Sequence, residues 1–258
     1  MAYLTIKMFS NCLRRHTTFD MIIPNDLRAD RPQSEEKPMK TLFLLHGYTG
    51  SAGNWVPEWL TEKYHFAIVM PSGENGFWLD GQATGHQFET LIAVELVDYV
   101  RKTFGLAMRA EDTCIMGMSM GGFGALHTAL AHPDRFGKAG GMSSALIVHG
   151  IAGMKPGQDN GMANYDYYRE CFGDLETVVQ SRANPEVLVE ELLARGEKLP
   201  EMYMCCGTED FLLEANRHFH AFLEEKGVEH VYMESAGAHD MPFWDEYIKK
   251  IIPWMFEE

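Results

Sequence analysis

The amino-acid sequence predicts an α/β protein in which helices cover both faces of a mostly parallel central sheet. Short apolar runs recur at residues 41–45, 66–70, 114–116 and 202–206, and a glycine-bearing loop follows each run. Strands buried on both faces of a parallel sheet have this continuous apolar character. Segments with helical apolar spacing separate the runs, as the crossover connections of a parallel sheet require.

Composition is typical of a single globular domain. The 258 residues are 46% hydrophobic and 23% charged, which is enough to bury a large core. The formal net charge of −15 argues against nucleic acid or an anionic membrane as the main partner. The five cysteines lack C-x-x-C spacing, which favours free thiols in a reducing compartment over disulfides or a zinc site.

The N-terminal residues have neither a basic stretch nor a long apolar one, so no signal peptide is expected. No apolar run approaches the roughly 20 residues that span a bilayer. We therefore expect a cytoplasmic protein that is not inserted in a membrane.

Periodicity places the remaining elements. Strands with period-two character are expected at residues 2–9 and 13–23, and further strands of small or apolar residues at 136–142 and 230–233. Helices are expected near residues 55–60 and at 88–100, 185–194, 213–226 and 244–254. Residues 24–38 are charged and contain prolines, which predicts a surface connection.

Residues 145–200 interrupt the alternation of strands and helices. They contain a glycine-rich stretch at 150–161, an aromatic cluster at 165–172 and one good helix. Loops of this length in a compact domain are usually functional, which favours a lid or cap over the carboxyl edge of the sheet. The alternative is a solvated excursion with one structural helix.

Gly117-Met118-Ser119-Met120-Gly121 joins an apolar run to a glycine- and alanine-rich helical segment. A G-x-S-x-G motif between strand and helix is typical of a tight turn that exposes a nucleophilic serine. Gly117 and Gly121 lack the side chains that such a turn would exclude. The next helix begins at the same point and directs its first N–H groups there. Ser119 is therefore the predicted nucleophile.

A serine hydroxyl needs a neutral histidine to take its proton. His239 lies in a glycine-flanked loop between the last predicted strand and the last helix, and is the predicted base. His218 and His220 fall within a predicted helix and His230 opens a strand, which favours surface or packing roles.

The base needs a carboxylate that orients it, and in such hydrolases the chain order is serine, acid, histidine. Asp210 follows a predicted strand and is the predicted acid. The neighbouring Glu209 is its nearest competitor, but should point elsewhere. Asp240 and Asp245 are too close in sequence to His239 for this order, and fit capping of the last helix better.

A developing oxyanion needs two preorganised donors. We expect the backbone N–H groups of Met120, directly after the nucleophile, and of Tyr48, in the glycine-bearing loop after residues 41–45. His46 in that loop is expected to orient it. The phenol of Tyr48 is either a pocket wall or a further donor.

Several motifs together resemble the putative esterase family, which includes esterase D, tributyrin, feruloyl and acetylxylan esterases and the mycolyltransferase antigens. They are His46-Gly47-x-x-Gly50 with Trp55, Pro71-Ser72-Gly73 with Phe77-Trp78, the stretch from Gly117 to Gly124, Gly207-Thr208-Glu209-Asp210 and Gly237-Ala238-His239-Asp240 with Trp244. The resemblance spans nearly the whole chain and is greatest to compact bacterial tributyrin esterases. It implies one α/β-hydrolase domain over residues 1–258, with the triad Ser119, Asp210 and His239. It also points to homo-oligomers, which are frequent in the family.

The resulting hypothesis is a serine carboxylesterase that hydrolyses short-chain acyl esters through an acyl-serine intermediate. Trp78 and Met142 are expected to line its substrate pocket. Alternatives are a feruloyl or acetyl esterase acting on plant-derived oligosaccharides, an S-formylglutathione hydrolase, or a non-catalytic binding protein on this scaffold. Neither a cofactor nor a metal is expected, because no nucleotide-binding motif is present and the imidazoles of His218-x-His220 should diverge on a helix.

Overall fold

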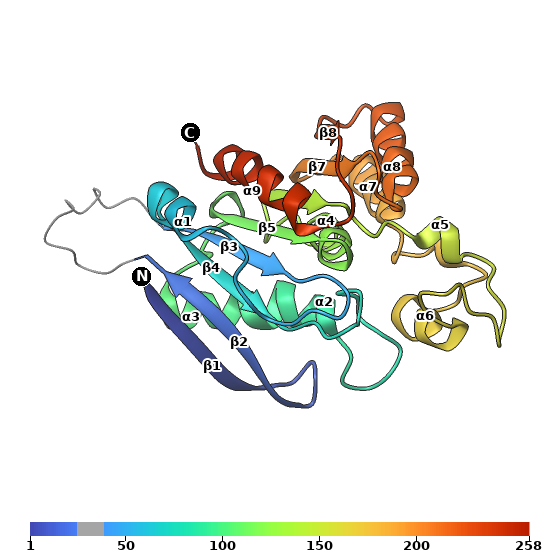
Figure 1. Cartoon of the computed structure of the whole chain (residues 1–258). Coiled ribbons are helices and arrows are strands. Elements are labelled where there is room, and N and C mark those ends of the chain that lie inside the picture. Colours follow the sequence, from blue (N-terminus) through green and yellow to red (C-terminus); the bar gives the residue numbers. More distant parts are fainter. Residues whose placement is uncertain (25–38, 258) are drawn as a thin grey trace, which may run out of the picture.

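The computed structural model describes residues 1–24 and 39–257. Its eight strands form one sheet in the order β1-β2-β4-β3-β5-β6-β7-β8 (Figure 1). β1 (Ala2–Ser10) and β2 (Arg15–Ile23) form an antiparallel hairpin, and β2 pairs antiparallel with β4. All pairs from β4 to β8 are parallel. The predicted mostly parallel α/β sheet is thus confirmed. The predicted connection at 24–38 lies, after its first residue, outside the described residues.

The predicted apolar runs form the centre of the sheet. The parallel strands are β3 (Lys40–Leu45), β4 (Phe66–Pro71), β5 (Thr113–Met118), β6 (Lys138–Met142), β7 (Glu201–Gly207) and β8 (Val231–Ser235). Every residue of β4 and β5 is buried, whereas β8 at the edge is only partly covered. The continuous apolar character of the runs therefore reflects burial on both faces.

Helices cover the two faces of this sheet. One face carries α2 (Phe88–Thr90), the π-helical segment η1 (Leu91–Leu96), α3 (Val97–Phe104), α4 (Met120–Ala131), α7 (Pro185–Arg195) and α8 (Leu213–Glu225). The other carries α1 (Glu58–Tyr64) and α9 (Met241–Phe256). Alternate residues of β3 enter different cores: Phe43 and Leu45 pack on the first side, Leu42 and Leu44 on the second. The predicted helix 88–100 is one continuous segment with a π-helical middle.

The segment between β6 and β7 has two parts. α7 packs against α4 and belongs to the core. α5 (Val148–Ile151) and α6 (Tyr165–Phe172), by contrast, lie beyond the ends to which the parallel strands point (Figure 1). A short 3-10 turn, η3 (Val178–Gln180), connects the two parts, and another, η2 (Ala110–Asp112), precedes β5. The carboxyl ends of parallel strands are where α/β proteins place their ligand sites.

None of the helices within residues 1–24 and 39–257 combines the length and the apolar character that a membrane span needs.

Candidate active site

The turn between β5 and α4 holds Ser119 in a strained backbone conformation, with φ 55° and ψ −120°. A Cβ atom on Gly117 would lie 2.2 Å from the carbonyl oxygen of Gly121. One on Gly121 would lie 2.2 Å from the carbonyl oxygen of Leu45 in β3. Both glycines are therefore required sterically, because backbone atoms cannot move aside for a side chain.

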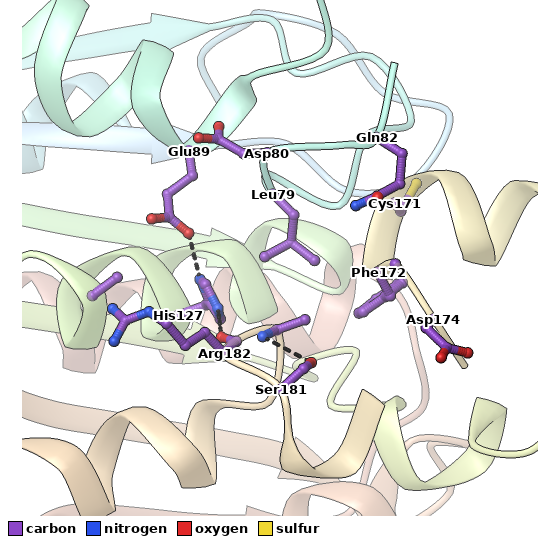
Figure 2. A pocket seen from close by; sticks show the side chains of 13 residues that line it. Leu79, Asp80, Gln82, Glu89, His127, Cys171, Phe172, Asp174, Ser181 and Arg182 are labelled. Carbon is purple, nitrogen blue, oxygen red and sulfur yellow. Dashed lines mark hydrogen bonds and ion pairs between the residues drawn. The ribbon is translucent and has the colours of Figure 1, made fainter. Parts of the chain in front are cut away.

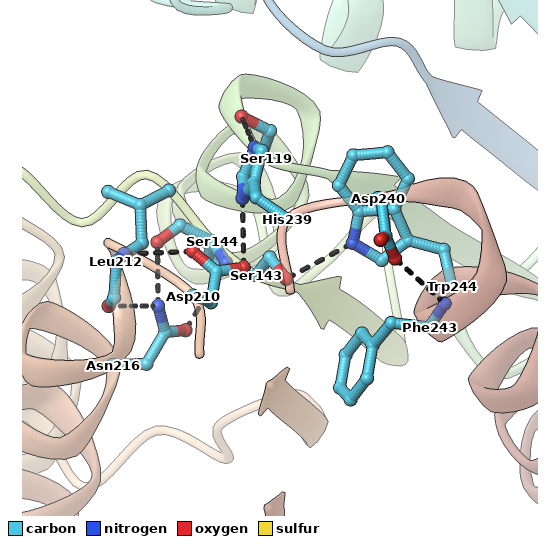
Figure 3. A network of polar contacts seen from close by, with 10 residues as sticks. All are labelled: Ser119, Ser143, Ser144, Asp210, Leu212, Asn216, His239, Asp240, Phe243 and Trp244. Carbon is cyan, nitrogen blue, oxygen red and sulfur yellow. Dashed lines mark hydrogen bonds and ion pairs between the residues drawn. The ribbon is translucent and has the colours of Figure 1, made fainter. Parts of the chain in front are cut away.

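The structure brings Ser119, His239 and Asp210 into one chain of hydrogen bonds (Figure 3). Ser119 Oγ lies 3.0 Å from His239 Nε2, and His239 Nδ1 lies 2.9 Å from Asp210 Oδ2. Asp210 follows β7, and His239 lies in the loop between β8 and α9. With a neutral imidazole, Nδ1–H donates to the carboxylate and Nε2 accepts from the serine hydroxyl. This is the geometry of a serine nucleophile with its base and orienting acid.

The Asp210 carboxylate is fully buried, yet it is held in its charged form. Burial alone would raise its pKa. Hydrogen bonds from His239, from Ser143 and from the backbone N–H of Leu212 outweigh burial and lower the pKa of Asp210 below its ordinary value. The Leu212 N–H donates to Oδ1 at 2.8 Å, which leaves Oδ2 for the imidazole.

Three groups fix the loop that carries His239. Glu209 Oε2 accepts a hydrogen bond from the Gly237 N–H at 2.5 Å, so this carboxylate binds the loop backbone and not the imidazole. A Cβ on Gly207 would lie 2.1 Å from the carbonyl oxygen of Gly237, so the end of β7 touches the same loop. Asp240 Oδ1 accepts from the Phe243 N–H at 3.2 Å and caps α9, the role expected for it.

A buried polar layer lies beneath the acid, and the sequence analysis did not identify it (Figure 3). Ser143 follows β6 with φ 46°, and its hydroxyl accepts from Trp244 Nε1 at 3.1 Å. Asn216 of α8 binds both the N–H of Ser144 at 3.2 Å and its carbonyl oxygen at 2.9 Å. These bonds hold β6, α8 and α9 around the acid. The visible sequence signal was the Ser-Ser pair directly after a predicted strand.

His46 fixes the loop after β3. Its Nδ1–H donates to the Gly47 carbonyl oxygen at 2.8 Å, and its Nε2 accepts from the Gly73 N–H at 3.0 Å. Burial lowers the pKa of His46, in keeping with the neutral ring that this pattern needs. A Cβ on Gly47 would lie 3.4 Å from Ser119 Cβ, so the loop backbone runs directly beside the nucleophile.

Both predicted oxyanion donors lie beside Ser119. Met120 is the first residue of α4, where helix N–H groups have no partner within the helix. Tyr48 follows Gly47 in the loop that touches the nucleophile. Its ring meets the ring of Tyr167 from α6 edge to face, with centroids 5.9 Å apart. The assignment of these two N–H groups remains a prediction.

Trp78 and Met142 do not lie where a pocket wall was expected. Neither side chain has any exposed surface. Trp78 packs against Gly73 and Gly124, where a Cβ would come within 2.6 Å of its ring, and its Nε1 donates to the His46 carbonyl oxygen at 3.2 Å. Both side chains support the site from behind. An aromatic residue in a loop can either pack between buried segments or line a pocket. The sequence alone does not distinguish these roles, which is why the prediction for Trp78 was wrong.

Two other aromatic side chains lie near the loops that carry the site. Phe211 directly follows the acid, is 66% exposed, and has its ring centroid 4.6 Å from that of His239. On the α6 side, the Tyr167 hydroxyl donates to the Asn75 carbonyl oxygen at 2.6 Å, and burial raises the pKa of Tyr167. The Asn75 side chain in turn accepts from the Thr49 N–H at 2.8 Å. Asn75 therefore connects α6 to the loop beside the nucleophile.

A separate cavity of about 400 Å³ lies along α4 (Figure 2). On its wall, Glu89 pairs with His127 at 3.1 Å and with His132 at 3.0 Å. His127 Nε2 donates to the Arg182 carbonyl oxygen at 2.7 Å. Burial acts to raise the pKa of Glu89, but the two imidazoles outweigh it and the pKa is lowered. None of the three triad residues lines this cavity.

Comparison with known proteins agrees with this geometry. A family model described as "Putative esterase" matches residues 10–255. An acetyl esterase of Caldicellulosiruptor saccharolyticus is 37% identical over 262 residues, which cover 99% of this chain and 98% of the relative.

Two solved structures from Staphylococcus aureus are also similar. The fluorophosphonate-binding serine hydrolase FphF has a TM-score of 0.85 and 27% identity, and the match covers 100% of this chain and 99% of that one. The S-formylglutathione hydrolase FrmB has a TM-score of 0.82 and 28% identity, with 99% of each chain covered. A ferulic acid esterase at 22% identity and a TM-score of 0.74 shares the fold.

Proposed function

The chain belongs to the putative esterase family and is a carboxylic ester hydrolase, and from this premise we propose that it hydrolyses short-chain acyl esters with Ser119, His239 and Asp210. The observation that carries the proposal is the continuous hydrogen-bond chain from Ser119 Oγ through both nitrogens of His239 to the buried Asp210 carboxylate.

The geometry supports a two-step reaction. Ser119 Oγ attacks the ester carbonyl carbon while His239 Nε2 takes the hydroxyl proton. Asp210 stabilises the imidazolium that forms, and the N–H groups of Met120 and Tyr48 bind the oxyanion. His239 returns the proton to the leaving alcohol, which leaves an acyl-serine. Water, activated by the same imidazole, then releases the acid and regenerates Ser119.

A short acyl group is favoured by the position of α6. Tyr167 ties α6 to the Asn75 backbone, and Asn75 binds the loop beside Ser119, so α6 is attached to that loop. We propose that residues of 145–200 act in this way as a lid. The relative described as an acetyl esterase supports the same substrate class.

Thioester hydrolysis is the second candidate. A protein described as an S-formylglutathione hydrolase shares the fold over 99% of this chain, and a formyl group is the smallest acyl group that a closed site could take. All five cysteines are free and buried, which supports a reducing compartment, and we propose the cytoplasm as the location and homo-oligomers as the form.

The test is an acyl series on the purified protein: 4-nitrophenyl acetate, butyrate and octanoate, with S-formylglutathione and methyl ferulate. We expect Ser119→Ala to lose at least about 10⁴-fold in kcat and to lose labelling by a fluorophosphonate. Ser51→Ala, at an exposed serine, is the matched control. Ser119→Ala turnover within tenfold of the unchanged protein would refute the assignment, and a preference for octanoate would refute the short-chain proposal.

A further inference from the structure

Two histidines and one glutamate from three different helices converge outside the triad. They are His149 of α5, Glu186 in the first turn of α7 and His218 of α8. Glu186 Oε1 lies 3.0 Å from His149 Nε2 and 2.9 Å from His218 Nε2. Their ligand-type atoms all lie within 4.8 Å of one another. In the part of the chain that the structure describes, this is the one such group of three or more metal-ligand side chains.

The arrangement suits a transition-metal ion. Imidazole nitrogen and carboxylate oxygen are ligands that bind Zn²⁺ at about 2.0–2.2 Å. Two ligands at that distance from one ion, about 90–110° apart, are separated by about 3 Å, close to the distances from Glu186 Oε1 to the two imidazole nitrogens. Both imidazoles approach through Nε2, which leaves each Nδ1 to carry the ring proton. Two imidazoles and one carboxylate favour zinc-like ions over Mg²⁺ or Ca²⁺, which prefer oxygen ligands.

The carboxylate is held in place by a buried neighbour. Asn184 Oδ1 accepts from the Glu186 N–H at 3.2 Å and so caps α7. Asn184 Nδ2 donates to Glu186 Oε2 at 3.3 Å and to the Val179 carbonyl oxygen at 2.8 Å. One carboxylate oxygen is thus occupied from behind and the other faces the imidazoles. Outer hydrogen bonds of this kind orient metal ligands.

The site is open on its outer side. The Glu186 side chain is 15% exposed, whereas those of His149 and His218 are 41% and 56% exposed. An ion can therefore enter from solvent and keep water in its remaining positions. The formal net charge of −15 favours the attraction of cations to the chain as a whole.

We propose that His149, Glu186 and His218 bind one divalent transition-metal ion of the zinc class. The ion would fasten α5 and α7, both in the inserted segment, to α8. α8 also carries Asn216, which holds Ser144 beside the triad. The role of the ion is structural, because it would link the inserted segment to α8. This inference does not depend on the proposed esterase function.

His149 lies 37 residues before Glu186, and His218 lies 32 residues after it. No short sequence motif therefore indicates this site. His218 was expected to diverge from His220. The two imidazoles do diverge: His220 Nδ1 lies 2.8 Å from His230 Nε2, while His218 turns to Glu186. His220, which lies on the same helix as His218 but pairs with His230, provides a matched control.

The test is binding of Zn²⁺ and Co²⁺ to the full-length, chelator-treated protein, by calorimetry and by the visible absorption of bound Co²⁺. We expect one ion per chain, and a rise in melting temperature with Zn²⁺. His149→Ala with His218→Ala should weaken binding at least about 100-fold, and Glu186→Gln about 10-fold or more. His220→Gln should bind as the unchanged protein does.

Circular dichroism establishes that each variant is folded, and His218→Gln alone, at an exposed position, provides a mild second variant. It should lose the Zn²⁺-dependent rise in melting temperature and keep ester hydrolysis. Absence of binding at about 100 µM metal, unchanged binding in the double variant, or loss of binding in His220→Gln would each overturn the proposal. Loss of ester hydrolysis in Ser119→Ala with intact metal binding would separate the two functions.

Discussion

Replacing Asp210 with asparagine tests the triad most sharply, because the structure dictates which way the new amide turns. Oδ1 accepts from the Leu212 N–H at 2.8 Å, so the amide oxygen takes that position. The amide NH₂ then faces His239 Nδ1 across 2.9 Å, where it needs an acceptor. The imidazole must move its proton to Nε2, and this tautomer cannot accept the proton of Ser119.

The expected decrease in kcat of the Asp210→Asn variant follows from two effects. At a separation of about 4 Å and an effective dielectric constant of about 20, a carboxylate and an imidazolium attract by about 4 kcal/mol. Loss of that attraction in the transition state slows the reaction about 10³-fold. The unfavourable tautomer increases the total to about 10³–10⁴-fold in kcat. KM should change little, because Asp210 is buried behind the imidazole.

The assay is steady-state hydrolysis of 4-nitrophenyl butyrate at pH 7, with Glu209→Gln as the matched control. Glu209 is the adjacent carboxylate, but it binds the Gly237 N–H and the Thr208 hydroxyl and not the imidazole. Its replacement should loosen the His239 loop and lower kcat by less than about tenfold. If Glu209→Gln loses as much activity as Asp210→Asn, the identification of the acid is wrong.

Two further predictions concern the supporting structure. Glu89→Gln should reduce the free energy of unfolding at pH 7, because His127 would lose its carboxylate partner. We expect a reduction of about 2–4 kcal/mol, which is smaller than the reduction for a fully buried pair. The pKa of Glu89 is lowered in the folded state. The carboxylate therefore contributes its full stabilisation above the pKa of an unfolded glutamate, about 4.3, and this stabilisation is lost as the pH falls below that value. In denaturant unfolding, the difference in free energy of unfolding between the unchanged protein and Glu89→Gln should become smaller from pH 7 to about pH 3.5. A difference that becomes larger would contradict this prediction. Tyr167→Phe removes the 2.6 Å bond to Asn75, worth about 1 kcal/mol, and should raise kcat/KM for octanoate relative to acetate severalfold. An unchanged ratio, matching a Tyr165→Phe control, would show that α6 does not limit acyl length.

The sheet and the tight turn around Ser119 were predictable because local constraints determine them. Strands with two buried faces must be apolar throughout, and the turn around Ser119 admits only glycine at 117 and 121. The order of acid and base along the chain then left few choices. Asp210 and His239 could be selected because each lies in the loop that follows a predicted strand.

What could not be predicted depends on contacts between distant segments. Asn216 lies 72 residues from its partner Ser144, and Trp244 lies 101 residues from its partner Ser143, and no spacing rule connects them. Glu89 and His127 meet only because α4 packs beside α2. The direction in which an aromatic loop residue points is likewise a tertiary property, which is why Trp78 was misplaced.

The 120 residues between Ser119 and His239 have a consequence for the order in which the protein is made. At a synthesis rate of about 5–20 residues per second, His239 is added about 6–24 s after Ser119. Under the proposed mechanism, the Ser119 hydroxyl lacks its base during that time, and the nascent chain should not hydrolyse esters. Hydrolysis should then start only when β7 and β8 have joined the sheet, so the first turnover after refolding would report that the last strand has docked.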